Sequence, residues 1–382
     1  MERIDSLNPA RLEWCCRDSG VSPEELAEAT DIAPKTMERA LAGEAAFTFN
    51  QLSRIATFFG RGVLFFMEPG SVDPEKVYTP QFRTLANQKP ELSHKVKLLI
   101  ERAEGQREAY LSMRQELDDP HPAFAPPKVP ANDIGSAAAI VRDWLGLDGQ
   151  RTFSEYRAAV ESKGVLVFRT NGYNGKWQIA KQTPILGFSL YDPVCPLIVV
   201  KKQSVDARQT FTLMHELGHV ILHKTSWIDE ESDLYSDETP EQHANAFAGL
   251  VLVPDIALSA IKDADRPGEV GDFDAWVRPM TSALGVSTEV ALRRLLDIGR
   301  LEATHYVAYR KYIAGFAHLG GEPAGSRAYR YREPTHLFGD RFVRTVLDAL
   351  SARRITIPKA SGYLDGLKLK DIRRLDQHSA GL

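Results

Sequence analysis

The sequence predicts a multidomain protein that is mostly α-helical, with an α+β core that holds a small sheet. The chain has 382 residues, which is longer than one typical domain. Apolar residues recur at helical spacing along most of it, whereas three short segments between residues 165 and 202 are rich in branched and aromatic side chains, as strands are. We therefore expect a helical N-terminal bundle, a central α+β domain and a small C-terminal domain.

The composition favours a soluble globular protein over a membrane or disulfide-rich secreted one. Hydrophobic residues make up 43% of the chain and charged residues 26%. No apolar run approaches the ~20 residues of a membrane helix, and the N-terminus lacks the apolar segment of a signal peptide. The three cysteines, Cys15, Cys16 and Cys195, are odd in number and two are adjacent, so they indicate no disulfide framework. We expect a cytoplasmic protein without membrane contacts, and nothing in the sequence indicates an oligomeric state.

Residues 1–70 are expected to form a helix-turn-helix bundle. Ser22 precedes Pro23 as a helix N-cap, and Glu25 follows three residues after Ser22, as in a capping box. A second helix begins at Pro34 and is stopped by Gly43. A third has apolar residues at helical spacing, namely Leu52, Ile55, Ala56 and Phe59. Short helices in this order are typical of a helix-turn-helix bundle.

This bundle resembles the N-terminal domain of XRE-type (Cro/C1-like) helix-turn-helix regulators. The resemblance is carried by Leu26-Ala27, Ile32, Pro34 to Leu41, Gly43, and Leu52 to Phe59. It implies a recognition helix from Pro34 to Leu41 that presents Lys35, Thr36 and Arg39 to DNA. Up to Glu68, however, the chain has seven basic and eleven acidic residues, and phosphate contacts need Lys and Arg. A protein-interaction or autoregulatory module is therefore the alternative to DNA binding.

Residues 71–132 are expected to connect this bundle to the core, and residues 133–300 to form the α+β domain. The connection contains a long polar helix, Pro90 to Leu117, and a linker rich in proline and charge up to Asp133. Two helices should open the α+β domain, over residues 136–147 and 152–164. Three strands should follow, over residues 165–170, 185–192 and 196–202.

The segment FTLMHELGHVILH, residues 211–223, predicts a metal site on a buried helix. His215 and His219 are spaced i, i+4, which places both imidazoles on one helix face, where they can bind one Zn²⁺. Glu216, beside the first histidine, can accept a proton from a water at the metal. His223 is one turn further along and is expected to orient a neighbouring ligand. The alternative is a buried helix with two histidines that are hydrogen-bonded and bind no metal.

A third ligand is expected from the next helix, EQHANAFAGLVLVP, which begins after Thr239 and Pro240. A carboxylate from a second helix completes His₂Glu zinc sites, and Glu241 is so placed. Asn245, four residues on, lies on the same face and is expected to orient a ligand histidine. His243 is the reserve ligand. Three protein ligands would leave one position for water, with Glu216 as the general base.

The whole segment resembles the ImmA/IrrE zinc metallopeptidases. HELGHVILH is followed by E-x-x-A-N-x-F-A and a closing L-V-P, and the strand-strand-helix lead-in from Ile185 is similar. The resemblance implies a gluzincin-like domain in which His215, His219 and Glu241 bind zinc and Glu216 is the base. It also implies a cytoplasmic, site-specific endopeptidase that cuts a helix-turn-helix repressor and thereby controls stress, defence or mobile-element genes. Long members carry an XRE-type domain in front, as this chain does.

Residues 301–382 are expected to form a basic regulatory domain. From Leu301 onward the chain has fourteen basic and eight acidic residues, with tyrosines among them. Such a surface could bind single-stranded nucleic acid or an acidic partner, or it could simply be solvated. Before it, the segment from Trp276 to Leu301 is expected to fold as two helices, with Ser287 as the N-cap of the second.

Two further hypotheses remain from the sequence. The first is a DNA-binding transcriptional regulator whose peptidase core is vestigial or accessory, and the intact set His215, Glu216, His219 and Glu241 argues against it. The second concerns Cys195, which precedes the metal-site helix and could cap zinc in a latent state. A buried small apolar role is the alternative for this cysteine.

Overall fold

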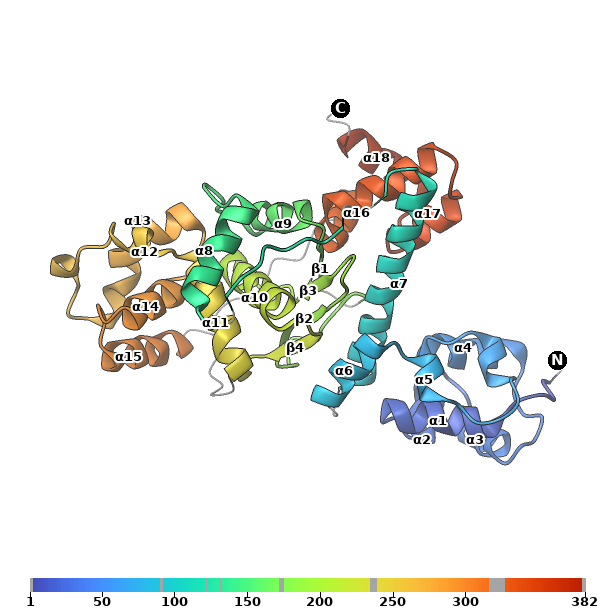
Figure 1. The fold of residues 1–382 in the computed structure, drawn as a ribbon. Coiled ribbons are helices and arrows are strands. Elements are labelled where there is room, and N and C mark those ends of the chain that lie inside the picture. Colours follow the sequence, from blue (N-terminus) through green and yellow to red (C-terminus); the bar gives the residue numbers. More distant parts are fainter. Residues whose placement is uncertain are drawn as a thin grey trace. The chain divides into compact units, whose positions relative to one another are not determined.

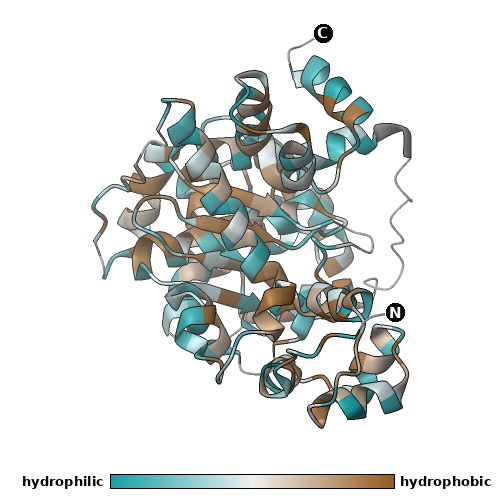
Figure 2. Ribbon diagram, turned by 90° about the vertical axis from the view of Figure 1, so that its right-hand side faces the viewer, coloured by the Kyte–Doolittle hydropathy of each residue, from teal (hydrophilic) through white to brown (hydrophobic). Residues whose placement is uncertain are grey.

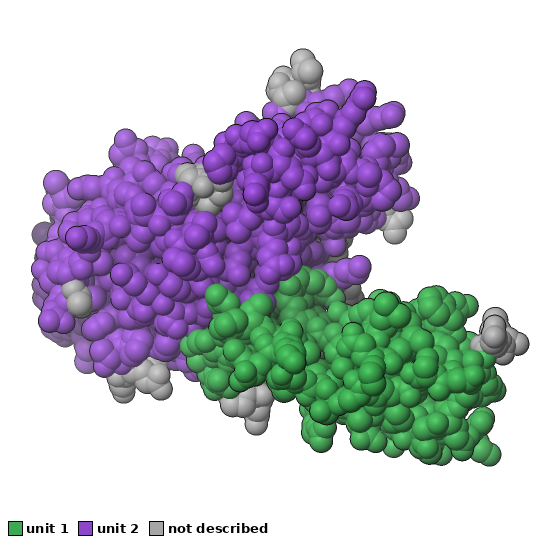
Figure 3. Space-filling model, turned by 45° about the vertical axis from the view of Figure 1, so that its right-hand side comes forward, with its two compact units in different colours: residues 1–102 green, residues 103–382 purple. Residues whose placement is uncertain are grey.

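The computed structural model describes residues 3–89, 92–120, 123–130, 132–171, 175–233, 239–315 and 327–379. The chain divides into two compact units, residues 1–102 and 103–382 (Figure 3). The division falls inside the long helix α7 (His94–Glu116), which the sequence predicted as part of a connecting segment. Each unit has its own apolar core, and each is described by itself below.

The N-terminal unit is a bundle of short helices whose ends follow the capping signals in the sequence. Ser22 and Glu25 form the predicted capping box, and Thr48 with Gln51 forms a second one. Gly60 ends the fourth helix with a left-handed backbone, φ 66°. The helices are α1 (Pro9–Ser19), α2 (Pro23–Ala29), α3 (Pro34–Leu41), α4 (Phe49–Phe59), η1 (Val63–Phe66), α5 (Pro74–Val77) and α6 (Pro80–Gln88).

The second unit is built around one four-stranded sheet with the order β1-β3-β2-β4. Its strands are β1 (Leu166–Arg169), β2 (Ile185–Leu190), β3 (Leu197–Val200) and β4 (Trp227–Glu230). β1 and β3 run parallel, whereas β2 is antiparallel to both β3 and β4. The first three strands confirm the sequence prediction. The fourth was not predicted, and it pairs with β2 through Phe188 opposite Ile228.

Helices cover this sheet, and the helix that carries the two histidines packs across β2 and β3 (Figure 1). Figure 2 shows the apolar residues concentrated on the strands and on the inward faces of the helices. The helices of this unit are α8 (Ile134–Leu145), α9 (Phe153–Ser162), α10 (Asp206–Gly218), η2 (His219–His223), α11 (Thr239–Leu252), α12 (Asp255–Leu258), η4 (Asp263–Asp265), η5 (Val270–Asp272), α13 (Phe273–Leu284), α14 (Thr288–Asp297), α15 (Ala303–Ala314), η6 (Arg327–Arg332), α16 (Glu333–Ser351), α17 (Ile357–Tyr363) and α18 (Leu369–Ser379).

A buried arginine, Arg157, links helix α16 to the part of the chain at the edge of the sheet through hydrogen bonds. Helix α16 lies beside β1 and breaks at Gly339, where φ is 80° and ψ is 165°. Arg157 of α9 donates hydrogen bonds to the carbonyls of Thr335, His336 and Leu337, which end the first part of α16. It also pairs with Glu161 at 3.0 Å. A side chain at position 339 would collide with this pair, so the break requires glycine.

Within the described residues, no helix combines the length and the apolar character needed to cross a membrane. The structure is thus mostly helical with one small mixed sheet, as the sequence predicted.

Candidate metal centre

Helix α10 and the turn η2 that continues it direct the predicted pair of histidines to one point in the interior. His215 and His219 are at most 1% exposed, and their Nε2 atoms lie 3.0 Å apart. At His219 the helix widens into one π-helical turn, η2, which ends at Lys224 with φ 52°. Such turns are uncommon and recur at functional sites. Gly218 has no side chain at this turn, which lets Phe247 and Ala244 of α11 pack closely against the helix.

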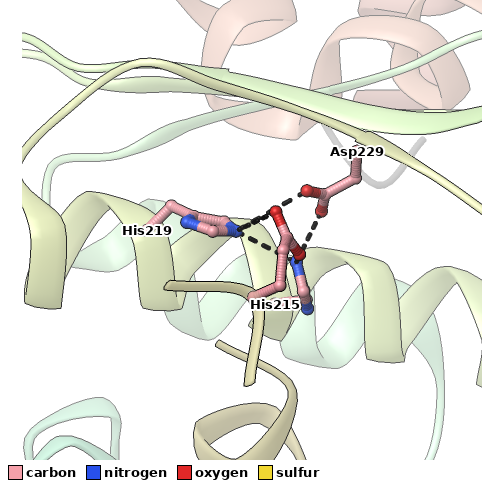
Figure 4. Close-up of side chains that lie close together, drawn as sticks. His215, His219 and Asp229 are labelled. Carbon is pink, nitrogen blue, oxygen red and sulfur yellow. Dashed lines mark hydrogen bonds and ion pairs between the residues drawn. The ribbon is translucent and has the colours of Figure 1, made fainter. Parts of the chain in front are cut away.

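Two carboxylates complete the cluster, one predicted and one not. Glu241, in the first turn of α11, places Oε2 3.2 Å from Nε2 of His215 and Oε1 3.7 Å from Nε2 of His219. Asp229, from strand β4, lies closer to the first histidine. Its Oδ2 is 2.8 Å from Nε2 of His215, and its Oδ1 is 3.6 Å from Nε2 of His219 (Figure 4).

The four side chains have the spacing of ligands around one ion. One donor atom from each of His215, His219, Asp229 and Glu241 can be chosen so that all lie within 4.8 Å of one another, and all four residues are buried. Ligands placed tetrahedrally at ~2.0–2.1 Å from zinc are ~3.3 Å apart. The observed separations of 2.8–3.7 Å surround that value. A single ion would therefore fit with small adjustments of the side chains.

Neighbouring side chains turn the binding nitrogens toward this point. The Asn245 amide donates from Nδ2 to the Asp233 carbonyl, which leaves its Oδ1 to accept from Nδ1 of His215 at 2.9 Å. Nδ1 of His215 therefore carries a proton, and Nε2 is the atom available to bind. Nδ1 of His219 is 3.0 Å from Nδ1 of His223, which likewise leaves its Nε2 to the cluster.

An indole from strand β4 holds two members of the cluster. Trp227 stacks on the His219 ring with a centroid distance of 4.6 Å and an interplanar angle of 8°. Its Nε1 donates a hydrogen bond to Oε1 of Glu241. One side chain thus fixes an imidazole plane and a carboxylate orientation together.

The two buried carboxylates of the cluster require a positive charge nearby. Burial opposes protonation of His215, but Asp229 and Glu241 outweigh it and raise the pKa of His215 to about 10. Burial alone would raise the pKa of Asp229, yet the adjacent His215 holds it far below its usual range. For His219, burial prevails and lowers the pKa. Two buried carboxylates beside two imidazoles are the environment that a divalent cation would satisfy.

Glu216 lies next to the first histidine and faces strand β2. Its carboxylate is fully buried against Gly187, where an added Cβ would lie 2.9 Å from Oε1 of Glu216. Burial raises the pKa of Glu216 well above its usual range, and the charge of Asp229 adds to this. In the described part of the chain neither of its oxygens forms a hydrogen bond of regular geometry, although the Ser189 hydroxyl favours the ionised form. A buried carboxylate with a raised pKa is suited to proton transfer.

A cavity of about 560 Å³ lies beside Asn245, the residue that accepts a hydrogen bond from His215. Thr212 of α10 lines it too, and α14 contributes Glu289 and Arg293. Phe211 adds an aromatic surface. Such a volume, with mixed polar and apolar walls, is large enough to accept side chains of a peptide.

His243 and Cys195, two other residues singled out in the sequence, do not belong to the cluster of donor atoms. His243, the reserve ligand, lines the cavity and does not join the cluster. Tyr173, Tyr191 and His243 are the residues that the sequence offers, unranked, as donors to the oxyanion; Tyr191 packs at the border of the apolar core, and Tyr173 lies outside the described residues. Cys195 is completely buried among Arg107, Asp192 and Arg341, and burial raises the pKa of its thiol to about 12. This environment matches a packing role rather than a zinc cap.

The predicted DNA contacts of the N-terminal unit lie on helix α3. Lys35 and Arg39 are exposed, and Thr36 is half-buried. Arg39 forms an ion pair with Glu44 at 2.5 Å, which neutralises part of the charge expected to meet phosphate.

Sequence reasoning missed Asp229, Trp227 and Gly187. Asp229 stands in the run WIDEESD, where three other carboxylates follow it. No sequence signal distinguishes Asp229 from these neighbouring carboxylates, because its position near the histidines depends on the pairing of β4 with β2. Gly187 occurs in a predicted strand, and an isolated glycine there indicates a close approach by another group. That signal was available in the sequence.

Comparison with known proteins places part of the chain near a peptidase family. Residues 160–296 match the model of a peptidase family described as the IrrE N-terminal-like domain. Immunity region protein 2 of Bacillus phage phi105 is 37% identical over 84 residues, which cover 21% of this chain and 52% of that protein. The chain thus spans about half the length of this curated relative. Both findings support the ImmA/IrrE family, and residues 160–296 are similar to its peptidase domain.

Proposed function

We propose that the protein is a zinc-dependent, site-specific endopeptidase. The observation that carries this proposal is the convergence of two Nε2 atoms and two carboxylates on one buried point, with the Glu216 carboxylate beside them. A purely structural histidine pair would not need two buried carboxylates, because each buried charge costs free energy unless it is matched.

The donor set favours zinc among the common divalent ions. Two imidazole nitrogens with carboxylate oxygens at tetrahedral spacing are typical of zinc, whereas calcium and magnesium prefer six or more oxygens. His215, His219 and Glu241 are assigned as the ligands. Asp229 is close enough to be a fourth, because its Oδ2 is the carboxylate oxygen nearest to His215.

The chain's own residues would then carry the proton transfers of peptide hydrolysis. Zinc held at the cluster would supply Lewis acidity, which polarises the scissile carbonyl and makes a water easier to deprotonate. Glu216 accepts the proton of the attacking water on a carboxylate oxygen and returns it to the departing amine nitrogen. Gly187 leaves the space that this carboxylate occupies, and Trp227 with Asn245 keeps the ligands oriented.

The proposed substrate is a protein, and a helix-turn-helix repressor is the preferred class. The cavity beside Asn245 can take peptide side chains from a locally unfolded segment. The relative's name places it in the immunity region of a phage, which fits a repressor-related role. Cleavage of such a repressor would switch on stress, defence or mobile-element genes.

The test combines metal analysis with cleavage. Purified protein should contain about one zinc per chain, and His215→Ala should lose it. Incubation with a repressor encoded beside the gene should give one defined cut. Glu216→Gln should retain the metal and abolish the cut, because the amide cannot accept the proton.

Glu269→Gln is the matched control, since Glu269 is an exposed carboxylate away from the cluster. It should leave both the metal content and the cut unchanged. Wild-type protein without bound metal, or equal cleavage by Glu216→Gln, would refute the proposal.

A further inference from the structure

The last helices of the chain have the arrangement of a helix-turn-helix unit. The part of α16 that follows Gly339 is joined to α17, and α17 to α18 through five residues, 364–368. Asp365 and Gly366 in this turn have left-handed backbones, with φ of 55° and 72°. Leu364 and Leu367 of the same turn are buried. The short glycine-containing connection between two helices is the signature of this motif.

Helix α18 is divided into a buried and a basic face. Ile372 and Leu375 are at most 2% exposed and pack inward. Lys370, Arg373, Arg374 and Gln377 are spaced i, i+3, i+4 and i+7, so they share the opposite face, and all four are exposed. The helix next to the C-terminus in Figure 2 is accordingly hydrophilic along most of its length.

The basic side chains of this face are not neutralised by the protein. Within the described ranges, Lys370, Arg373 and Arg374 form no ion pair; Arg374 instead lies 4.9 Å from the Tyr331 ring centroid. Residues 340–379 contain nine Lys and Arg against five Asp. By contrast, three arginines in and just after α14 are neutralised. Arg293, Arg294 and Arg300 pair with aspartates at 2.9 Å or less. An unneutralised helix face is what binding to phosphate requires.

We propose that α16–α18 bind duplex DNA, with α18 as the helix that enters the major groove. This function is additional to the proposed peptidase activity and does not depend on it. A helix fits the major groove of B-DNA, whereas the deep groove of double-stranded RNA cannot be read by side chains. Lys370 and Arg373 can contact phosphates or guanine, and Gln377 can contact adenine. The basic face therefore fits a DNA duplex better than an RNA duplex.

The experiment measures binding of the full-length protein to a labelled mixed-sequence DNA duplex of about 30 base pairs, three helical turns. Non-specific binding of Kd ~10⁻⁴–10⁻⁶ M at physiological salt is enough, so no operator is needed. The α18 variant is Lys370→Ala with Arg373→Ala. The matched control is Arg278→Ala with Lys311→Ala, which removes two exposed cations from α13 and α15, away from α16–α18. A third protein, Lys35→Ala with Arg39→Ala, tests the N-terminal bundle separately.

The α18 variant should bind at least about tenfold more weakly near 50 mM salt. The slope of its log affinity against log salt concentration should become shallower by about 0.9 for each phosphate that the variant no longer neutralises. The control and the N-terminal variant should keep most of the wild-type affinity. All variants should keep the wild-type circular dichroism and melting temperature, because the replaced side chains are exposed.

Three outcomes would overturn the inference. One is α18-variant binding as tight as that of the wild type. Another is a wild-type protein that binds no duplex at low salt. The third is preferential binding of a single-stranded oligonucleotide that is unaffected by the α18 substitutions.

Discussion

Replacing Gly187 by alanine should displace the carboxylate of Glu216 without removing the metal. A Cβ at this position would lie 2.9 Å from Oε1 of Glu216, from Cγ2 of Thr212 and from the carbonyl oxygen of Val199. Ordinary contacts of carbon are ~3.5 Å or more, so the overlap is about 0.6 Å at each atom. The Val199 carbonyl belongs to the neighbouring strand and cannot yield easily. We therefore expect overpacking to cost about 1–3 kcal/mol of stability.

The displaced base should also slow catalysis, because a misplacement of ~1 Å can cost on the order of 100-fold in rate. We expect Gly187→Ala to lower kcat by ~10- to 100-fold in the repressor-cleavage assay while zinc content stays at the wild-type level. Gly105→Ala is the matched control. Position 105 lies inside α7 with open space around its Cβ, so alanine should stabilise the helix by up to ~1 kcal/mol. Wild-type cleavage and an unchanged melting temperature for Gly187→Ala would refute the reasoning.

Two further predictions concern the side chains around the proposed metal, and a third concerns Glu161, which pairs with Arg157 beside α16. Asp229→Asn should weaken zinc binding by ~10- to 100-fold in competition with a chelator, and equal affinity would show that Asp229 does not act on the metal. Trp227→Phe keeps the ring stack but loses the hydrogen bond to Glu241, so it should weaken zinc binding less than Glu241→Gln does; a larger loss would contradict this ranking. Burial raises the pKa of Glu161 to about 7 from 4.5, so the folded state binds its proton more tightly than the unfolded state. Its contribution to stability is therefore complete below pH 4.5 and is lost as pH rises toward 7. Denaturant titrations should show this loss in the wild type and its absence in Glu161→Gln; the same slope in both proteins would exclude Glu161 as its source.

Local signals were sufficient to predict most helices and three strands. The capping box of Ser22 and Glu25 and the N-cap at Ser287 lie where the sequence placed them, because each depends on residues three positions apart. The i, i+4 spacing of His215 and His219 likewise needed only a helix. These features depend only on residues that are close together in the sequence, so a single sequence is enough to recognise them.

Features that depend on long-range pairing could not be predicted in this way. Asp229 reaches the histidines because β4 pairs with β2, some forty residues earlier in the chain. The π-helical turn at His219 arises where α11 packs closely on Gly218. At the C-terminus, composition indicated a basic surface that could bind single-stranded nucleic acid, bind an acidic partner or be solvated. The turn at Asp365 is what arranges α17 and α18 as a helix-turn-helix unit.

The central claim is that one zinc ion is held by His215, His219 and Glu241 beside a carboxylate base. Anomalous diffraction from crystals of the purified protein, recorded at the zinc absorption edge, tests it most directly. We predict one strong peak at ~2.0–2.2 Å from both Nε2 atoms and a Glu241 oxygen. A second zinc-edge measurement on Glu216→Gln crystals should give the same peak. Absence of a peak at this cluster, or a Glu241 side chain directed away from the ion with no other carboxylate in its place, would contradict the account.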